Sequence, residues 1–297
     1  VSVISAFLTF FPVAVNTLLT GDDFDFMLRD SRAQALIVSE ALLPVFKPIL
    51  GDQPFLKHIV VAGTNSSAHP RLSDLMASAA TDFTVAPTRP DDACFWLYSS
   101  GSTGTPKGVV HVQTSLMRTA ELYAQPILGI EASDVVFSAA KLFFAYGLGN
   151  ALTFPLSVGA TTVLLSDRPT PQAVCRVLRE HRPTIFYGVP TLYSALLSCP
   201  DLPKREDLNL RRCTSAGEAL RTVALAKLAE WSAVAKAGGE PPLFAADDFD
   251  AGLSETWAEE FWDALPREAT VLLTTTTAPA RWARRAGGLL EVSRGSV

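Results

Sequence analysis

The chain has 297 residues, 48% of them hydrophobic and 19% charged, with a formal net charge of -5. This composition is typical of a globular protein that can bury one large core or two medium-sized ones. The acidic balance argues against a surface devoted to nucleic acid. The four cysteines have no Cys-x-x-Cys spacing and do not cluster with the four histidines, which argues against a zinc site.

The apolar opening of the chain, residues 1–19, lacks a positively charged start, and Pro12 and Asn16 interrupt it. It therefore predicts neither a secretory signal nor a membrane-spanning helix, and we expect a cytoplasmic protein with reduced thiols. Because the chain begins with Val1 and runs directly into an apolar stretch, we expect a fragment that starts inside a domain. Residues 1–11 are assigned as an apolar lead-in.

From residue 12 to about 220, short apolar strand-like runs alternate with helical patterns, which indicates an α/β domain. Thr20 is a suitable N-cap for the first helix, and Asp22 and Asp23 favour its first turn. The strand 161–165, the helix 172–181 and the strand 184–189 form one unit in which we expect the two strands to pair in parallel. The other expected elements of this part are strands at 35–38, 58–61, 94–98, 109–112 and 134–138 and helices at 22–29, 72–79 and 113–128. Beyond residue 220 we expect helices at 221–236 and 254–262 and strands at 243–246 and 270–274.

A glycine-rich stretch, residues 99–108, lies between two of these strands. Glycine allows successive backbone amides to converge on an anion, hydroxyl groups add donors, and Lys107 supplies a cation. We therefore predict a hairpin connection that holds the phosphates of ATP, with Lys107 and Thr103 as catalytic residues. The predicted phosphate-binding residues are Ser99, Ser100, Gly101, Ser102, Thr103, Gly104 and Lys107.

This stretch is not a Walker A element, because Gly108, Val109 and Val110 follow Lys107 where that element has Ser or Thr and then a helix. The alternative is a flexible glycine-rich linker. Two apolar strands that flank the stretch favour the phosphate loop over a linker.

Residues 98–108 resemble the phosphate-loop motif of the acyl-adenylate-forming enzymes, the AMP-binding acyl-CoA synthetase superfamily. Residues 12–17, 188–191 and 215–218 resemble further landmarks of that superfamily, in the same order. The resemblance covers residues 12–220. It implies an α/β fold in which a partial N-terminal acyl-adenylating domain, with mixed and parallel sheets, precedes a small α/β segment at 221–297.

Residues 141–150 look most like benzoate-CoA ligases, in which this segment forms part of the pocket for the aromatic acid. Small Ala145 and Gly147 beside aromatic Phe144 and Tyr146 are expected to leave a flat apolar slot. The alternative is that these aromatic side chains belong to the core. The resemblance implies that Phe144, Ala145, Tyr146 and Ala216 bind the acid and that Gly217, Glu218 and Ala219 approach the adenine.

The resemblance implies an acid-thiol ligase that acts on a small aromatic carboxylate, with ATP, Mg²⁺ and coenzyme A and with no membrane partner. The carboxylate attacks the α-phosphorus of ATP to give acyl-AMP, and coenzyme A then displaces AMP to give a thioester. The superfamily's later magnesium motif, ribose-binding aspartate and C-terminal catalytic lysine are not evident in the sequence. We therefore expect an incomplete, inactive fragment, and the alternative is a non-catalytic nucleotide-binding fragment.

Residues 215–226 also resemble the signature loop and helix of an ABC-type ATPase, and residues 243–249 resemble the Walker B strand of the RecF class of DNA-repair ATPases. This second resemblance implies that Asp247 holds magnesium and that Asp248 polarises water; nucleic acid is a partner in this interpretation alone. The alternative is a strand that ends in two solvated aspartates. We hypothesise that the chain is a chimera of two coding sequences that meet within 215–220, by fusion or assembly error, since this would account for both resemblances.

Overall fold

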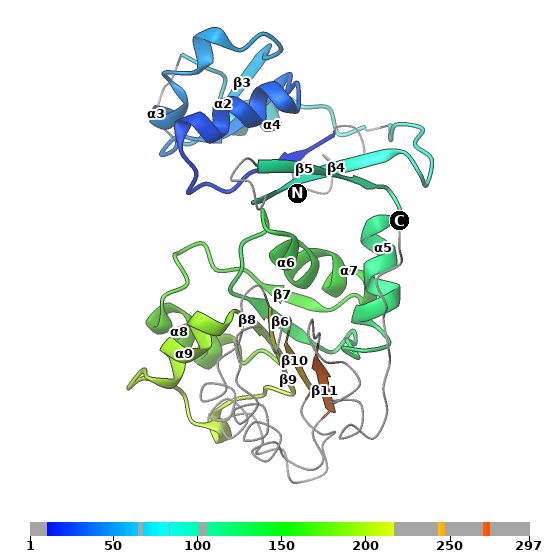
Figure 1. Cartoon of the computed structure of the whole chain (residues 1–297), viewed down its shortest axis with the longest axis vertical. Helices are drawn as coiled ribbons and strands as arrows, with labels where there is room; N and C mark the ends of the chain where they lie inside the picture. Colours follow the sequence, from blue (N-terminus) through cyan, green and yellow to red (C-terminus); the bar gives the residue numbers. More distant parts are fainter. Residues whose placement is uncertain are drawn as a thin grey trace, which may run out of the picture. The chain divides into compact units, whose positions relative to one another are not determined.

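The structure is a computed structural model that describes residues 11–64, 68–82, 84–100, 106–216, 243–246 and 270–273 (Figure 1). The chain divides into two compact units. One comprises the residues up to Leu116 together with Phe143–Ala145, and the other comprises the remaining residues. The boundary predicted near residue 220 falls among residues outside the described ranges.

The first unit contains two small sheets. In one, β4 (Ala93–Ser100) pairs in parallel with β1 (Val13–Ala14) and antiparallel with β5 (Pro106–Val112). In the other, β2 (Ala35–Ser39) pairs in parallel with β3 (His58–Ala62). The strands expected around residues 35, 58, 94 and 109 are therefore confirmed, as is the hairpin arrangement of β4 and β5.

The helix α2 (Gly21–Asp30) begins as the sequence predicts. The Thr20 hydroxyl accepts the amide of Asp23 at 3.3 Å, and the Asp23 carboxylate accepts the amide of Thr20 at 3.0 Å. This reciprocal capping satisfies two backbone donors at the start of the helix. The other helical segments of this unit are α3 (Leu43–Phe46), η1 (Leu50–Asp52) and α4 (Leu72–Ser78).

The core of the first unit lies between α2, α3 and the β2–β3 sheet. Phe24 stacks on Phe46 with a centroid distance of 4.4 Å. Both rings are buried together with Val38 from β2 and Val61 from β3. Burial of such side chains stabilises this unit by about 1.5–3 kcal/mol for each residue.

The second unit is built on a four-stranded parallel sheet with the order β7-β6-β8-β9. Its strands are β6 (Val135–Ser138), β7 (Thr161–Val163), β8 (Ile185–Gly188) and β9 (Arg212–Ser215). The strands β7 and β8 are both parallel to β6, but each pairs with β6, which lies between them. The expected parallel orientation of β7 and β8 is therefore confirmed, but the expectation that the two strands pair with each other is wrong. The apolar β6 takes a central place because Val136 and Phe137 are completely buried there.

One face of this sheet packs against α8 (Pro171–His181) and α9 (Pro190–Leu197), with Phe186 and Tyr193 in the shared core. The other face carries a separate core that includes Ile185 and Tyr187. The strand β8 contributes side chains to both cores, and all of its residues are buried. The helical segments beside the second core are η2 (Ala120–Ala124), α6 (Ala145–Leu148), η3 (Gly149–Thr153) and α7 (Phe154–Val158).

Two helical expectations need correction. The helix expected over 113–128 is α5 (Ser115–Thr119) followed by the π-helical η2, so it ends earlier. The helical run 145–158 was not expected, since Gly149 and Pro155 disfavour a continuous helix. Pro155 occupies the first turn of α7, directly after the π-helical η3, and Gly159 ends the run with φ +78°.

The remaining described elements are η4 (Arg205–Asp207) and a parallel pair formed by β10 (Leu243–Ala246) and β11 (Thr270–Leu273). These two strands confirm the expected strand positions near residues 243 and 270. The helices expected at 221–236 and 254–262 lie outside the described residues. Among the residues that the structure describes, no helix is both long enough and apolar enough to cross a membrane.

Candidate active site

Two residues that the sequence analysis assigned to the acid, Tyr146 and Ala216, lie at the carboxyl end of the four-stranded sheet of the second unit. The strands β6, β8 and β9 end at Ser138, Gly188 and Ser215. Ala216 follows β9 directly, and the Tyr146 hydroxyl reaches the ends of β8 and β9. In open parallel α/β sheets, ligands bind outside this end of the strands. Tyr146 and Ala216 therefore lie at the edge where a ligand is expected.

Two hydrogen bonds hold Tyr146. Its hydroxyl donates to the carbonyl oxygen of Gly188 at 3.2 Å and lies 2.7 Å from the hydroxyl oxygen of Thr214. The ring meets Tyr187 edge-on with centroids 6.4 Å apart. Burial raises the pKa of Tyr146, so the hydroxyl stays protonated at neutral pH. The side chain is thus a fixed, neutral group.

Phe144 and Ala145 are exposed, and Phe144 retains 44% of its accessible surface. Its ring lies 4.6 Å from that of Phe143 at an angle of 58°. The alternative in which these aromatic residues belong to the core is therefore wrong for Phe144. An exposed aromatic side chain in this segment is available to a ligand.

Gly147 has a packing role that the sequence analysis did not anticipate. A Cβ atom at this position would clash with the carbonyl oxygen of Lys141 and would lie 2.7 Å from that of Ala140. Only a residue without a side chain fits here, because the backbone at 140–141 passes against it. The expectation that Gly147 helps to form a slot for the acid stays a prediction.

Lys141 fixes the beginning of the same segment. Its ammonium group donates to the carbonyl oxygens of Leu165, Ser166 and Asp167, the last at 2.6 Å. Burial lowers the pKa of Lys141. The sequence analysis assigned no role to this residue, and a lysine that precedes an apolar aromatic run was the available signal.

The predicted phosphate loop lies between β4 and β5 of the first unit. Ser99 pairs with Lys107 and Ser100 with Pro106, so the two strands bracket residues 101–105. Ser99 and Lys107 are exposed, and among the described residues Lys107 makes no ion pair. The structure thus brings a hydroxyl and a free cation to the same end of the hairpin. Gly101, Ser102, Thr103 and Gly104 lie outside the described residues.

The base of this hairpin is anchored by Tyr98. Its hydroxyl donates to the Asp30 carboxylate at 2.7 Å, and burial raises its pKa, with a further contribution from Asp30. A Cβ atom on Gly108 would lie 3.1 Å from Trp96 and 3.3 Å from Tyr98. Gly108 therefore permits close packing of β5 on these rings. The sequence analysis assigned it to the phosphate loop without anticipating this contact.

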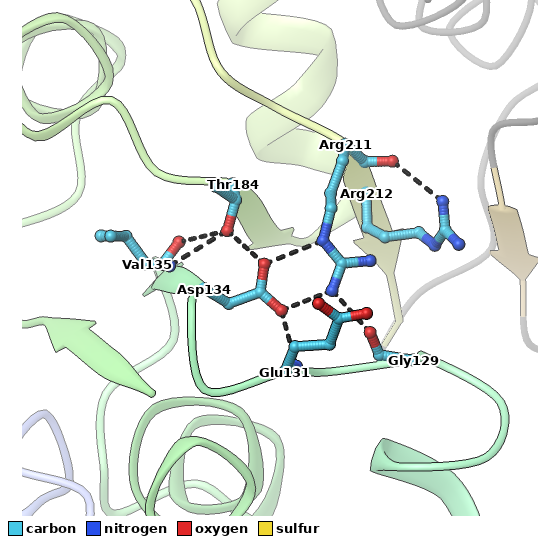
Figure 2. A network of polar contacts seen from close by, with 7 residues as sticks. All are labelled: Gly129, Glu131, Asp134, Val135, Thr184, Arg211 and Arg212. Atoms are coloured by element: carbon cyan, nitrogen blue, oxygen red, sulfur yellow. Dashed lines mark hydrogen bonds and ion pairs between the residues drawn. The ribbon is translucent and has the colours of Figure 1, made fainter. Parts of the chain in front are cut away.

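A charged network lies at the opposite, amino end of the parallel sheet (Figure 2). Asp134, Thr184 and Arg211 immediately precede β6, β8 and β9. The Arg211 guanidinium donates from Nε to the Asp134 carboxylate at 2.8 Å and forms a second bond to it through Nη2. The Thr184 hydroxyl donates to the same carboxylate at 2.7 Å. The network therefore joins the starts of three strands.

The carboxylate of Asp134 is only 3% exposed and is satisfied by its neighbours. Burial alone would raise its pKa, but hydrogen bonds from Arg211, Thr184 and the amide of Glu131 outweigh burial and lower the pKa. Arg211 also donates to the carbonyl oxygen of Gly129. The sequence analysis missed this network. A polar residue directly before each of three parallel strands was the available signal.

Several predicted residues fall outside the described ranges: Gly217, Glu218, Ala219, Asp247 and Asp248. Within the described part of the chain, no three His, Cys, Asp or Glu side chains group as metal ligands. The proposed adenine contacts and the roles assigned to Asp247 and Asp248 therefore stay predictions.

A family model described as AMP-binding enzyme matches residues 6–239. The chain belongs to the AMP-binding enzyme family. This family membership confirms the first resemblance. The second resemblance, to RecF-type ATPases, receives no support from the comparisons, and the family match extends beyond the expected junction at 215–220.

Relatives of this family member include the benzoate–CoA ligase of Thauera aromatica, which is 62% identical over 209 residues. The 4-hydroxybenzoate–CoA/benzoate–CoA ligase of Rhodopseudomonas palustris is 45% identical over 214 residues. Each match covers 70% of this chain and 39% of the relative. The chain thus spans about two fifths of the length of these curated relatives.

Solved structures of the family agree with the fold. A benzoate CoA ligase from Burkholderia xenovorans LB400 gives a TM-score of 0.68 at 49% identity, covering 75% of this chain and 44% of that chain. An anthranilate CoA ligase in complex with anthranoyl-AMP gives 0.70 at 35% identity, covering 75% and 43%. The expected α/β fold of a partial acyl-adenylating domain is therefore confirmed.

Proposed function

We propose that this chain takes part in the ATP-dependent activation of a benzoate-like aromatic carboxylic acid to acyl-AMP and then to the acyl-CoA thioester. The observation that carries the proposal is the 62% identity to the benzoate–CoA ligase of Thauera aromatica. The fixed position of Tyr146 at the carboxyl end of the parallel sheet supports it, because this end of the sheet is a common ligand site.

The acid-binding residues in this proposal are Phe144, Ala145, Tyr146 and Ala216. Exposed Phe144 offers an aromatic face, on which a planar acid can stack. Tyr146 offers an immobilised ring whose hydroxyl is already hydrogen-bonded within the protein. An acid with an apolar ring therefore fits these residues better than an acid whose ring carries strongly polar substituents.

The triphosphate-binding residues in this proposal are those of the β4–β5 hairpin. Ser99 and Lys107 fit a polyanion because both are exposed and are paired across the hairpin. Attack of a carboxylate on the α-phosphorus needs charge neutralisation and no protein nucleophile. Lys107 would provide that neutralisation, Thr103 would add a hydroxyl donor, and Gly217, Glu218 and Ala219 would bind the adenine.

Magnesium and coenzyme A complete the proposed reaction. The described residues offer no group of metal ligands, so we assign no described residue to magnesium and derive no step through it. Coenzyme A would supply the thiol that accepts the acyl group, and no described residue is assigned to it. We also propose a cytoplasmic location, which is supported by the four cysteines being free thiols.

The test is benzoate-dependent exchange of pyrophosphate into ATP, measured on the 297-residue chain with benzoate, ATP and magnesium. Exchange supports the activation reaction. A second candidate is nucleotide binding without turnover, which needs only the exposed Ser99 and Lys107 that pair across the β4–β5 hairpin. ATP binding without exchange supports this second candidate. If the chain binds neither benzoate nor ATP, both candidate functions are contradicted.

The RecF-like hypothesis for the segment after residue 215 has no support from the comparisons, and the parallel β10–β11 pair is the only structure described beyond residue 216. Parallel strand pairs are common to α/β proteins, so this observation is not specific. ATP-dependent association with DNA would support the hypothesis. Equal retention on DNA with and without ATP would remove it.

A further inference from the structure

The hydrogen bond between Tyr146 and Thr214 links two segments that are far apart in sequence. Thr214 lies in β9, is 3% exposed, and is followed by Ser215 and Ala216. Its hydroxyl is 2.7 Å from that of Tyr146 in α6. Its backbone carbonyl oxygen accepts the Tyr193 hydroxyl at 2.8 Å, so the strand itself is also held.

The donors and acceptors around Tyr146 determine the direction of this bond. A tyrosine hydroxyl has one proton, and a backbone carbonyl can only accept. When Tyr146 donates to Gly188 at 3.2 Å, the Thr214 hydroxyl must therefore be the donor in the shorter contact. Removing the Thr214 hydroxyl takes away that donor and leaves Tyr146 with the longer bond alone.

The other end of the same segment does not depend on Thr214. Lys141 is held by the carbonyl oxygens of Leu165, Ser166 and Asp167, and Gly147 packs against the backbone of Lys141. Loss of the Thr214 bond is therefore expected to release the Tyr146 ring while the start of the segment stays in place.

We propose that Thr214 is a positioning residue for the aromatic acid, acting through the hydroxyl of Tyr146. The inference rests on the proposed function and deepens it, because it names a residue that sets the orientation of the acid site. Thr214 belongs to the strand that leads into Ala216, so one hydroxyl couples the two segments to which acid binding is assigned.

The chain offers a matched control in Thr162, a threonine of β7 in the same sheet. Its hydroxyl oxygen is buried and has no hydrogen-bond partner among the described residues. Thr162→Val makes the same chemical change as Thr214→Val, but it breaks no hydrogen bond. The comparison therefore separates loss of this particular bond from the general effect of a threonine-to-valine change.

The experiment measures the dissociation constants of benzoate and of ATP for the 297-residue chain by NMR titration, in Thr214→Val, Thr214→Ser, Tyr146→Phe and Thr162→Val. We expect Thr214→Val and Tyr146→Phe each to weaken benzoate binding about fivefold, the scale of one net hydrogen bond. ATP binding should not change. Thr214→Ser and Thr162→Val should bind benzoate as the unaltered chain does, and Thr214→Val combined with Tyr146→Phe should be no weaker than either alone.

Unaltered benzoate binding by Thr214→Val overturns the inference, as does an equal loss in Thr162→Val. Additive losses in the double variant also overturn it, because the two hydroxyls would then act separately. If Thr214→Val does not fold, Tyr146→Phe and Thr214→Ser still decide the outcome. Failure of the unaltered chain to bind benzoate contradicts the proposed function itself and removes the inference with it.

Discussion

The two ends of the four-stranded sheet use polar side chains in opposite ways. At the amino end, Asp134, Thr184 and Arg211 satisfy one another through charged hydrogen bonds. At the carboxyl end, Tyr146 and Thr214 form neutral hydrogen bonds, and the buried hydroxyl of Ser215 has no partner among the described residues. The amino end has its charges neutralised internally, whereas the carboxyl end retains hydrogen-bonding capacity.

The two ends of the sheet therefore contribute differently to folding stability and to ligand binding. A buried ion pair is costly to break because the remaining charge is stranded. Neutral hydroxyl pairs contribute less free energy, so they can orient a ring without dominating folding. Substitutions at the amino end should therefore change the free energy of unfolding, and substitutions at the carboxyl end should mainly change ligand binding.

The largest effect is expected for Arg211→Met. It leaves the Asp134 carboxylate, 3% exposed, without its cation. We expect the free energy of unfolding to fall by about 3–5 kcal/mol, measured by urea denaturation. Arg176→Met is the control, because its pair with Asp167 is exposed and should contribute less than about 1 kcal/mol. Equal losses in the two variants would contradict the contrast.

A pH dependence follows from Asp134. Because its folded pKa lies below the unfolded value, its contribution is present above the unfolded pKa, about 3.9, and is lost as the pH falls through the folded pKa. The free energy of unfolding should therefore decrease in acid below about pH 4. Asp134→Asn should flatten this part of the profile when unfolding is measured between neutral pH and pH 3. An unchanged acid limb in that variant would show that Asp134 does not carry the effect.

Lys141→Met tests the carboxyl end with an intermediate effect. The change removes the donor shared by the carbonyl oxygens of Leu165, Ser166 and Asp167. We expect a loss of about 1–2 kcal/mol in unfolding free energy, because hydrogen bonds from a charged donor are lost while water can solvate the exposed oxygens of Ser166 and Asp167. Benzoate affinity should fall as well, since the segment that carries Phe144 loses its first anchor. Weaker folding with unchanged benzoate affinity would restrict Lys141 to a structural role.

Ser215→Ala is expected to have the smallest effect. The hydroxyl is buried and unpartnered among the described residues, so its removal deletes no hydrogen bond. The free energy of unfolding should stay within about 0.5–1 kcal/mol of the unaltered value, with a gain more expected than a loss. Thermal denaturation can measure this change. A loss as large as that of Lys141→Met would mean that Ser215 has a structural partner.

The sequence predicts the local elements well where side-chain chemistry fixes the ends. Thr20 as N-cap, with acidic Asp22 and Asp23 in the first turn, predicted the start of α2. The apolar runs predicted the strands β4, β5, β6 and β8, and the glycine-rich stretch predicted the hairpin that joins β4 to β5. These features depend on neighbouring residues, and periodicity and capping report such local preferences directly.

The order of strands and the two anchoring networks could not be read from local patterns. The position of β6 between β7 and β8 depends on burial on both faces of the sheet. The bonds from Arg211 to Asp134 and from Thr214 to Tyr146 join residues far apart in the chain. Gly147 was expected to open a slot, and only the fold reveals the backbone that passes against it.

The most direct test of the account is an NMR map of backbone amide shifts during titration of the 297-residue chain with benzoate. The account predicts that the largest shifts in the second unit occur at Tyr146, Thr214 and Ala216, at the carboxyl end of the sheet. Asp134, Thr184 and Arg211 should shift little, because their hydrogen bonds are already satisfied. Shifts concentrated at the amino end, or none in the presence of saturating benzoate, would contradict it.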